Sequence, residues 1–155
     1  MNKAFKFIIS LLIPQLAGGL GSIFTASSVG DWYKTIEKGP LNPPSWVFGP
    51  VWTTLFLLIG LSLFLIWTKS EGDKRKLALV VFGIQLFLNV LWSVLFFGSQ
   101  NPGLALLEIL VLWAAILMNL IVFYRLNKTA GWLLLPYLLW VSFAIYLNFS
   151  IWRLN

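Results

Sequence analysis

Long apolar segments separated by short polar ones dominate this sequence. Each segment runs for about 20 residues or more without a charge, apart from Glu108 in the fourth, and that length lets a helix cross the hydrocarbon core of a bilayer. The pattern predicts an all-α integral membrane protein, a five-transmembrane-helix bundle that forms a single domain over residues 1–155. The predicted spans are 7–29, 46–68, 77–97, 104–124 and 129–152.

The first span has a second interpretation. Lys3 and Lys6 followed by an apolar run also fit a secretory signal peptide, but the uncharged stretch continues to Val29, which is longer than the usual signal core and favours a retained helix. Pro14 is expected to bend it. Stripes of small residues predict close packing, either within the bundle or at a dimer seam: Ala17–Gly21–Thr25 and Gly18–Ser22–Ala26.

The charge of the chain is asymmetric across the predicted membrane. The formal net charge is +6, and only 10% of the residues are charged. Eight of the 11 basic residues fall on one side of the five spans, all in short connections, which indicates the cytoplasmic side. We therefore expect a cytoplasmic N-terminus, with the first loop and the C-terminus on the opposite side. Because orientation accounts for the basic residues, nucleic acid is not an expected partner.

The composition also restricts the chemistry. The chain has no cysteine and no histidine, which excludes disulfides, thiolate chemistry and the usual ligands of metals and haem. We find no paired nucleophile and base either. No metal site is predicted and no cofactor is required, so a bound tetrapyrrole would be held by its faces and edges.

Four of the nine tryptophans, Trp52, Trp92, Trp113 and Trp140, lie well inside apolar segments. Tryptophan in membrane proteins normally collects at the two water interfaces, and an indole N–H in hydrocarbon needs a partner or a purpose. Several large aromatic surfaces inside one bundle predict a site for a flat, apolar ligand.

Polar residues gather in the half of the bundle that is predicted to lie away from the cytoplasm, here called the outer half. Gln85, Asn89 and Trp92 share a face of the third span, and Trp140, Ala144, Leu147 and Asn148 share a face of the fifth. Polar groups in a membrane are costly and tend to face the bundle interior or a cavity. This pattern predicts a ligand pocket, with Asn89 and Asn148 as hydrogen-bonding groups. The alternative is that the amides only bond across helices.

Two features border that region. Loop 30–45 carries Trp32, Tyr33 and two proline-containing pairs, so it is expected to lie over the bundle as a lid, although an ordinary interfacial loop fits the same residues. Lys34 or Lys38 in this loop could meet ligand carboxylates. Glu108 is expected to reach interfacial water or a first-turn amide, in preference to a role in proton transport.

Three motifs resemble one known family. They are the run Pro43–Thr53 (PPSWVFGPVWT), the segment Leu88–Trp92 (LNVLW) with a following FFG, and the segment Pro136–Trp140 (PYLLW). These runs are similar to the signatures of the tryptophan-rich sensory proteins, the bacterial relatives of the animal translocator protein or peripheral benzodiazepine receptor. The likeness extends from about Pro14 to Arg153.

The resemblance implies a dimeric five-helix receptor with a pocket beneath the first loop. Members bind porphyrins such as protoporphyrin IX and drug-like isoquinoline or benzodiazepine molecules, and some bacterial members are reported to degrade porphyrin in light. Trp52 and Trp140 would carry that photochemistry. From the residues and the resemblance together, the expected ligand-binding residues are Ser22, Tyr33, Pro43, Phe48, Trp52, Phe56, Asn89, Trp92, Trp140, Phe143, Ala144, Leu147 and Asn148.

Sterol binding is not expected, because Phe149 stands where the sterol motif of animal members requires a tyrosine. Two other functions remain open. One is a transporter of tetrapyrroles or other hydrophobic solutes, which would need a polar exit through the inner half. The other is a stress-response scaffold whose partner docks on the basic second loop, around Lys74, Arg75 and Lys76.

Overall fold

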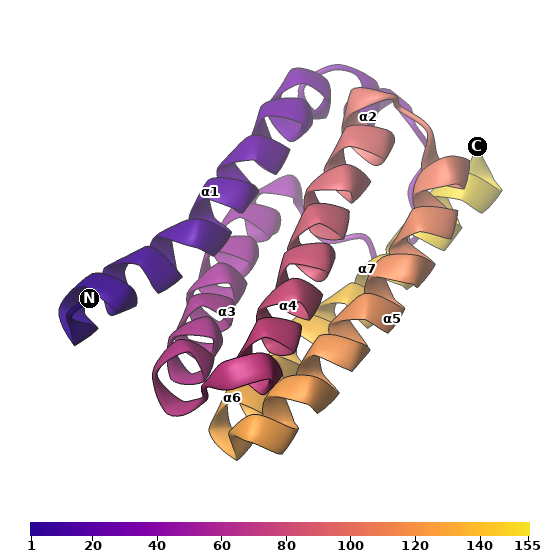
Figure 1. Cartoon of the computed structure of the whole chain (residues 1–155). Coiled ribbons are helices and arrows are strands. Elements are labelled where there is room, and N and C mark those ends of the chain that lie inside the picture. The colour runs from indigo at the N-terminus through magenta and orange to yellow at the C-terminus, as the bar shows by residue number, and fades with distance from the viewer.

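The computed structural model describes residues 1–155, and every regular element in it is a helix. Five helical stretches are long and apolar enough to cross a membrane, which confirms the predicted fold class (Figure 1). The elements are α1 (Lys3–Val29), α2 (Trp32–Thr35), η1 (Ser45–Val47), α3 (Phe48–Lys69), α4 (Gly72–Ser93), η2 (Val94–Gly98), α5 (Pro102–Leu126), α6 (Lys128–Leu133) and α7 (Leu135–Leu154).

Several helices extend beyond the apolar runs from which they were predicted, because local capping sets their ends. The side chain of Asn2 accepts a hydrogen bond from the backbone N–H of Phe5 at 2.8 Å, so α1 begins at Lys3 and not at residue 7. Asn101 caps α5 in the same way through the N–H of Leu104 at 3.0 Å. Polar caps satisfy the free N–H groups at helix starts, where the chain leaves the hydrocarbon.

Helix α1 packs against two neighbouring helices. Its N-terminal part packs on α3, where Gly60 lets the backbone of Ser10 approach closely. It bends as Pro14 predicts, and its upper part lies against α4, where Gly21 faces Ser93 (Figure 1). Gly18 faces the ring of Phe56 on α3. The glycines of both small-residue stripes therefore pack within the chain.

Two irregular elements shape the outer half and the last span. The C-terminal end of α4 continues into η2, a five-residue π-helix that the hydrophobic pattern did not indicate. The last span is divided at Leu134, between α6 and α7, where Pro136 lies in the first turn of α7. A proline cannot donate to the preceding turn, so α6 and α7 are separate helices within this span.

The solid core of the bundle lies in its inner half. Ile59 and Ile66 on α3, Phe82 on α4 and Phe123 on α5 belong to one cluster of buried side chains, and the rings of Phe82 and Phe123 stack with centroids 6.1 Å apart. Large apolar side chains also cover the outside of the helices, as on Leu16, which is 66% exposed. Such a surface requires lipid around it, and the chain is an integral, multi-pass membrane protein.

Candidate functional site

The first loop lies over one end of the bundle, the end predicted to face away from the cytoplasm, and is anchored at several points. Tyr33 on α2 is buried against Phe97, and its hydroxyl accepts a hydrogen bond from Nδ2 of Asn42 at 3.0 Å. Asn155 at the C-terminus accepts from the backbone N–H of Glu37 and donates to its carbonyl, at 3.1 and 2.9 Å. Burial raises the pKa of the Tyr33 hydroxyl, and the bond from Asn42 opposes part of that rise.

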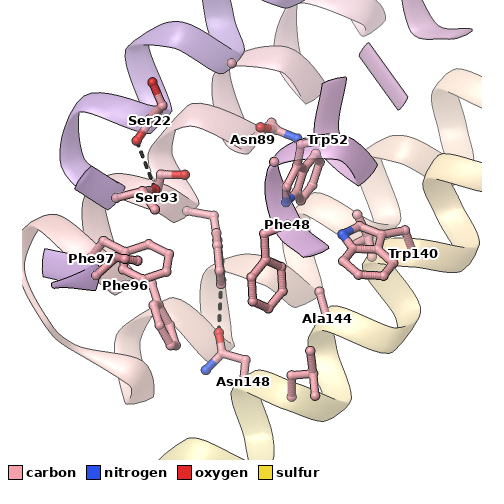
Figure 2. A pocket seen from close by; sticks show the side chains of 18 of the residues that line it. Ser22, Phe48, Trp52, Asn89, Ser93, Phe96, Phe97, Trp140, Ala144 and Asn148 are labelled. Carbon is pink, nitrogen blue, oxygen red and sulfur yellow. Dashed lines mark hydrogen bonds between the residues drawn. The ribbon is translucent and has the colours of Figure 1, made fainter. Parts of the chain in front are cut away.

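Beneath this loop is a cavity of about 490 Å³. It lies between the outer halves of α1, α3, α4 and α7, with two residues of α5 at the back, and its size is typical of small-molecule sites. Eleven of the residues selected from the sequence line it: Ser22, Tyr33, Phe48, Trp52, Phe56, Asn89, Trp92, Trp140, Ala144, Leu147 and Asn148 (Figure 2).

Two of the selected residues do not line the cavity. Pro43 lies in the loop beside Asn42, and it is Asn42 that faces the cavity. Phe143 follows Trp140 by three residues on α7 and packs on the indole with centroids 5.5 Å apart. Successive helix residues differ by about 100° in direction, so a face that presents Ala144 to the cavity turns Phe143 to the flank.

The four interior tryptophans separate into two kinds. Nε1 of Trp92 donates to Asn148 at 2.9 Å, and Nε1 of Trp113, outside the cavity, donates to the hydroxyl of Ser142 at 2.8 Å. The indole N–H groups of Trp52 and Trp140 bond to no protein group, and both rings lie on the cavity wall with Phe48 close by (Figure 2). These two indoles thus offer unbonded donors at the cavity wall, and the ring of Phe56 stacks on Trp52 with centroids 5.5 Å apart.

The amides that were predicted to bind ligand also differ from each other. Asn148 uses Oδ1 to accept from Trp92 and Nδ2 to donate to the carbonyl of Pro102 at 2.8 Å, so it joins three helices and each of its amide atoms already has a protein partner. Asn148 therefore bonds across helices and also lines the cavity, and its contact with a ligand stays a prediction. Asn89 uses Nδ2 to donate to the hydroxyl of Tyr137 at 2.7 Å, which leaves its Oδ1.

Reasoning from sequence missed many of the lining residues. On α1 the small residues Gly18, Gly21 and Thr25 form part of the wall, and their stripe was visible but was interpreted as helix packing alone. On α5 the aliphatic Ile109 and Leu112 line the back, and nothing in their residue type distinguishes them from core positions. Which aliphatic residues face the cavity depends on the rotation of each helix about its axis.

The cavity is open on one side, between α1 and α3. Gly19 and Ser22 on α1, with Gly49 and Thr53 on α3, line the cavity and yet remain exposed. Below them the side chain of Gln15 donates to the carbonyl of Thr53 at 3.1 Å and joins the two helices. The opening therefore faces the surroundings of the bundle in its outer half.

No charged side chain lines the cavity. Lys34 is exposed on α2, away from the wall. The ammonium of Lys38 donates to the carbonyls of Tyr33 and Ile36 at 2.6 and 3.0 Å and lies 4.7 Å from the ring centroid of Tyr33. Neither lysine lines the cavity and Lys38 stabilises the loop, so contact of either lysine with ligand carboxylates stays a prediction.

Glu108 also differs from its expected setting. It is only 8% exposed, and neither carboxyl oxygen has a hydrogen-bond partner. It lies on the buried stripe of α5, between Ala105 and Ile109, and not at a first-turn amide. The side chain of Glu108 points into the protein, and no backbone amide at the N-terminus of α5 donates to its carboxyl group.

The fold and the cavity define a class of protein: a polytopic membrane protein with an uncharged aromatic site under its first loop. Comparison with known proteins agrees with this class. The family model described as TspO/MBR family matches residues 10–153, and the chain belongs to that family. Membership supports a role as a membrane receptor or sensor.

Three relatives illustrate the range of the family. The chain is 44% identical over 150 residues to the tryptophan-rich protein TspO of Archaeoglobus fulgidus, with 97% of each chain covered. It is 37% identical over 147 residues to the translocator protein of Homo sapiens, covering 93% of this chain and 86% of the relative. It is 37% identical over 125 residues to the tryptophan-rich sensory protein of Cereibacter sphaeroides, covering 81% and 77%.

Proposed function

We propose that this protein is a membrane receptor for porphyrin-like tetrapyrroles and other flat hydrophobic molecules of the isoquinoline or benzodiazepine type. The proposal is supported by two indoles on the wall of one uncharged cavity, those of Trp52 and Trp140. Their N–H groups have no protein partner, unlike those of Trp92 and Trp113. A flat apolar ligand buries its faces against such rings, and its acceptor atoms can take the two N–H groups.

The electrostatics of the cavity limit how a porphyrin would lie in it. Ionised carboxylates in a cavity without a cation would carry a large desolvation cost. We therefore expect the macrocycle to enter and its propionates to stay in the opening between α1 and α3, near Gly19 and Gly49. The bilayer is a partner in this proposal, since a ligand dissolved in lipid meets that opening directly. The proposal also includes a homodimer, because the resemblance to the family implies one.

Transport is less well supported by the same geometry. A transporter needs a path through the inner half, and there the core is filled by Ile59, Ile66, Phe82 and Phe123. None of these four side chains lines the cavity. A receptor needs no such path.

The direct test is titration of the purified full chain with protoporphyrin IX, followed by porphyrin fluorescence. We expect Trp52→Phe with Trp140→Phe to weaken binding by about tenfold or more, because two hydrogen bonds and part of the aromatic surface are lost. Unchanged affinity in the double variant would contradict the proposal. The same samples under illumination test whether light-dependent porphyrin loss depends on these indoles.

Trp113→Phe is the matched control. Trp113 is an interior tryptophan with a bonded indole N–H, but it does not line the cavity. Its replacement removes the same group from the same membrane half and is expected to leave porphyrin affinity unchanged. A loss as large as in the double variant would show that the effect is general damage to the bundle.

A further inference from the structure

Asn89 on the cavity wall begins a buried chain of hydrogen bonds that leads away from the cavity. Its Nδ2 donates to the hydroxyl of Tyr137 at 2.7 Å, and that hydroxyl donates to Oε1 of Gln85 at 2.8 Å. Gln85 and Tyr137 are almost fully buried and lie behind the lining residues. Helix α4 provides both ends of this chain, and α7 provides the link.

The direction of each bond in this chain depends on the next. A hydroxyl has one proton, and because Tyr137 donates it to Gln85, its oxygen can only accept from Asn89. Asn89 must then turn its NH₂ group toward Tyr137, and the carbonyl oxygen Oδ1 is left for the cavity. If Gln85 presented its NH₂ group instead, the chain would reverse and Asn89 would present N–H donors to the cavity.

Other buried amide atoms near this chain of bonds have no partner. Nε2 of Gln85 has no partner, and neither amide atom of Asn119 on α5 has one, although both residues are fully buried. Phe82 and Phe123 stack between α4 and α5. Gln85 lies about one turn after Phe82, and Asn119 about one turn before Phe123. In antiparallel helices these steps lead the same way, so Asn119 is at about the level of Gln85, although no hydrogen bond joins the two side chains.

Tyr137 also contacts a second group of the cavity. The edge of its ring meets the indole of Trp52, with centroids 6.3 Å apart and an interplanar angle of 74°. The same buried side chain thus supports an aromatic face and an amide on one wall. A residue that holds two wall groups from behind influences what the wall presents without touching ligand.

We propose that Tyr137 and Gln85 are positioning residues that make the cavity present a hydrogen-bond acceptor, Oδ1 of Asn89. The cavity then favours flat ligands that carry an N–H or O–H donor opposite this atom. This inference rests on the proposed function and adds the chemistry by which the same site selects its ligands.

Three flat tricyclic probes of nearly equal shape test it. Carbazole carries an N–H donor, fluorenone carries a carbonyl acceptor, and fluorene carries neither. Binding is measured by equilibrium dialysis against nanodiscs with and without the full chain, so that fluorene accounts for shape and for partition into lipid. We expect the unmodified chain to bind carbazole about tenfold more tightly than fluorene, the effect of one added hydrogen bond.

The decisive variant is Gln85→Met, which keeps the length of the side chain and removes its acceptor. The hydroxyl of Tyr137 then donates to Oδ1 of Asn89, and the amide turns its N–H groups to the cavity. We expect the ratio of carbazole to fluorenone affinity to fall by about tenfold. Tyr137→Phe is the second variant and should lower the ratio as well, because Asn89 then lacks the partner that orients it.

Ser62→Ala is the control, since Ser62 is a fully buried donor that bonds to the carbonyl of Ala130 away from the cavity. It should leave the ratio unchanged. A ratio that stays constant in both Gln85→Met and Tyr137→Phe, while fluorene still binds, would overturn the inference and leave the proposed function standing. If the unmodified chain bound none of the probes, the proposed function would fall, and the inference with it.

Discussion

At the scale of single residues, chemistry depends on whether a side chain already has a partner. Trp92 and Trp140 are both interior tryptophans that line the same cavity. The N–H of Trp92 is bonded to Asn148, whereas that of Trp140 bonds to no protein group. An unpaired polar group at a cavity wall loses its hydration and regains a bond only from a ligand. Trp140 is therefore a better candidate for ligand binding than Trp92.

The pKa of Tyr33 leads to a prediction about the lid. Burial raises this pKa above its ordinary value near 10, so the folded lid holds the hydroxyl proton more tightly than the unfolded chain does. The resulting stabilisation is present below about pH 10 and is lost as the pH rises further. We expect the thermal midpoint to fall more steeply as the pH rises above about 10 in the unmodified chain than in Tyr33→Phe.

Scanning calorimetry or an intrinsic-fluorescence melt at each pH makes this comparison. Every other ionisable group is the same in both proteins, so only the difference between the two curves reports on Tyr33. Parallel curves across the whole range would contradict the prediction. The hydroxyl also accepts from Asn42, so Tyr33→Phe should lower the midpoint at neutral pH.

At the scale of elements, α1 has two roles: its N-terminal part packs on α3, and its C-terminal part borders the cavity. Its lower part is packed tightly on α3, and its upper part lies further from α3 and forms one side of the cavity opening. A helix that is held at one end and bent at Pro14 can leave a gap at its other end without losing its place in the bundle. The cavity thus depends on the close contact below it.

Gly60 tests that dependence. A Cβ at this position would lie 2.7 Å from the carbonyl oxygen of Ser10 and 2.9 Å from the Cα of Leu11, both of them backbone atoms. Gly60→Ala must therefore separate α1 from α3, and we expect it to lower the free energy of unfolding by about 1 to 3 kcal/mol. Denaturation in detergent micelles measures the change.

The comparison for this variant is Gly83→Ala on α4, where a Cβ would meet nothing within 4 Å. Alanine is favoured over glycine inside a helix, so this protein should be as stable as the unmodified chain or slightly more so. Equal melting of the two alanine variants would show that α1 and α3 are not held as closely as Gly60 indicates.

At the scale of the whole molecule, the two ends of the bundle differ in charge and in structure. The end that carries α2 and the C-terminus has the anchored loop and the cavity, and the end that carries α6 has the basic connections (Figure 1). Cytoplasmic connections of membrane proteins are enriched in lysine and arginine. The site should accordingly open toward the non-cytoplasmic half of the bilayer.

The absence of cysteine makes this orientation simple to measure. Leu41→Cys in the first loop and Lys74→Cys in the second place one exposed thiol at each end. In spheroplasts of a bacterial host, a membrane-impermeant maleimide should label the cysteine at position 41 and should reach position 74 only after lysis. The reverse pattern would contradict the orientation inferred from charge.

The sequence alone determined the membrane class, the five spans and the region where aromatic and polar groups gather, because apolar run length and helical periodicity are local properties. The tertiary structure decided which indoles stay unpaired, that Asn148 joins helices while Asn89 keeps a free oxygen, and that Glu108 faces the protein interior. Those outcomes depend on the rotation and contacts of helices far apart in the chain, and a one-dimensional pattern does not contain them.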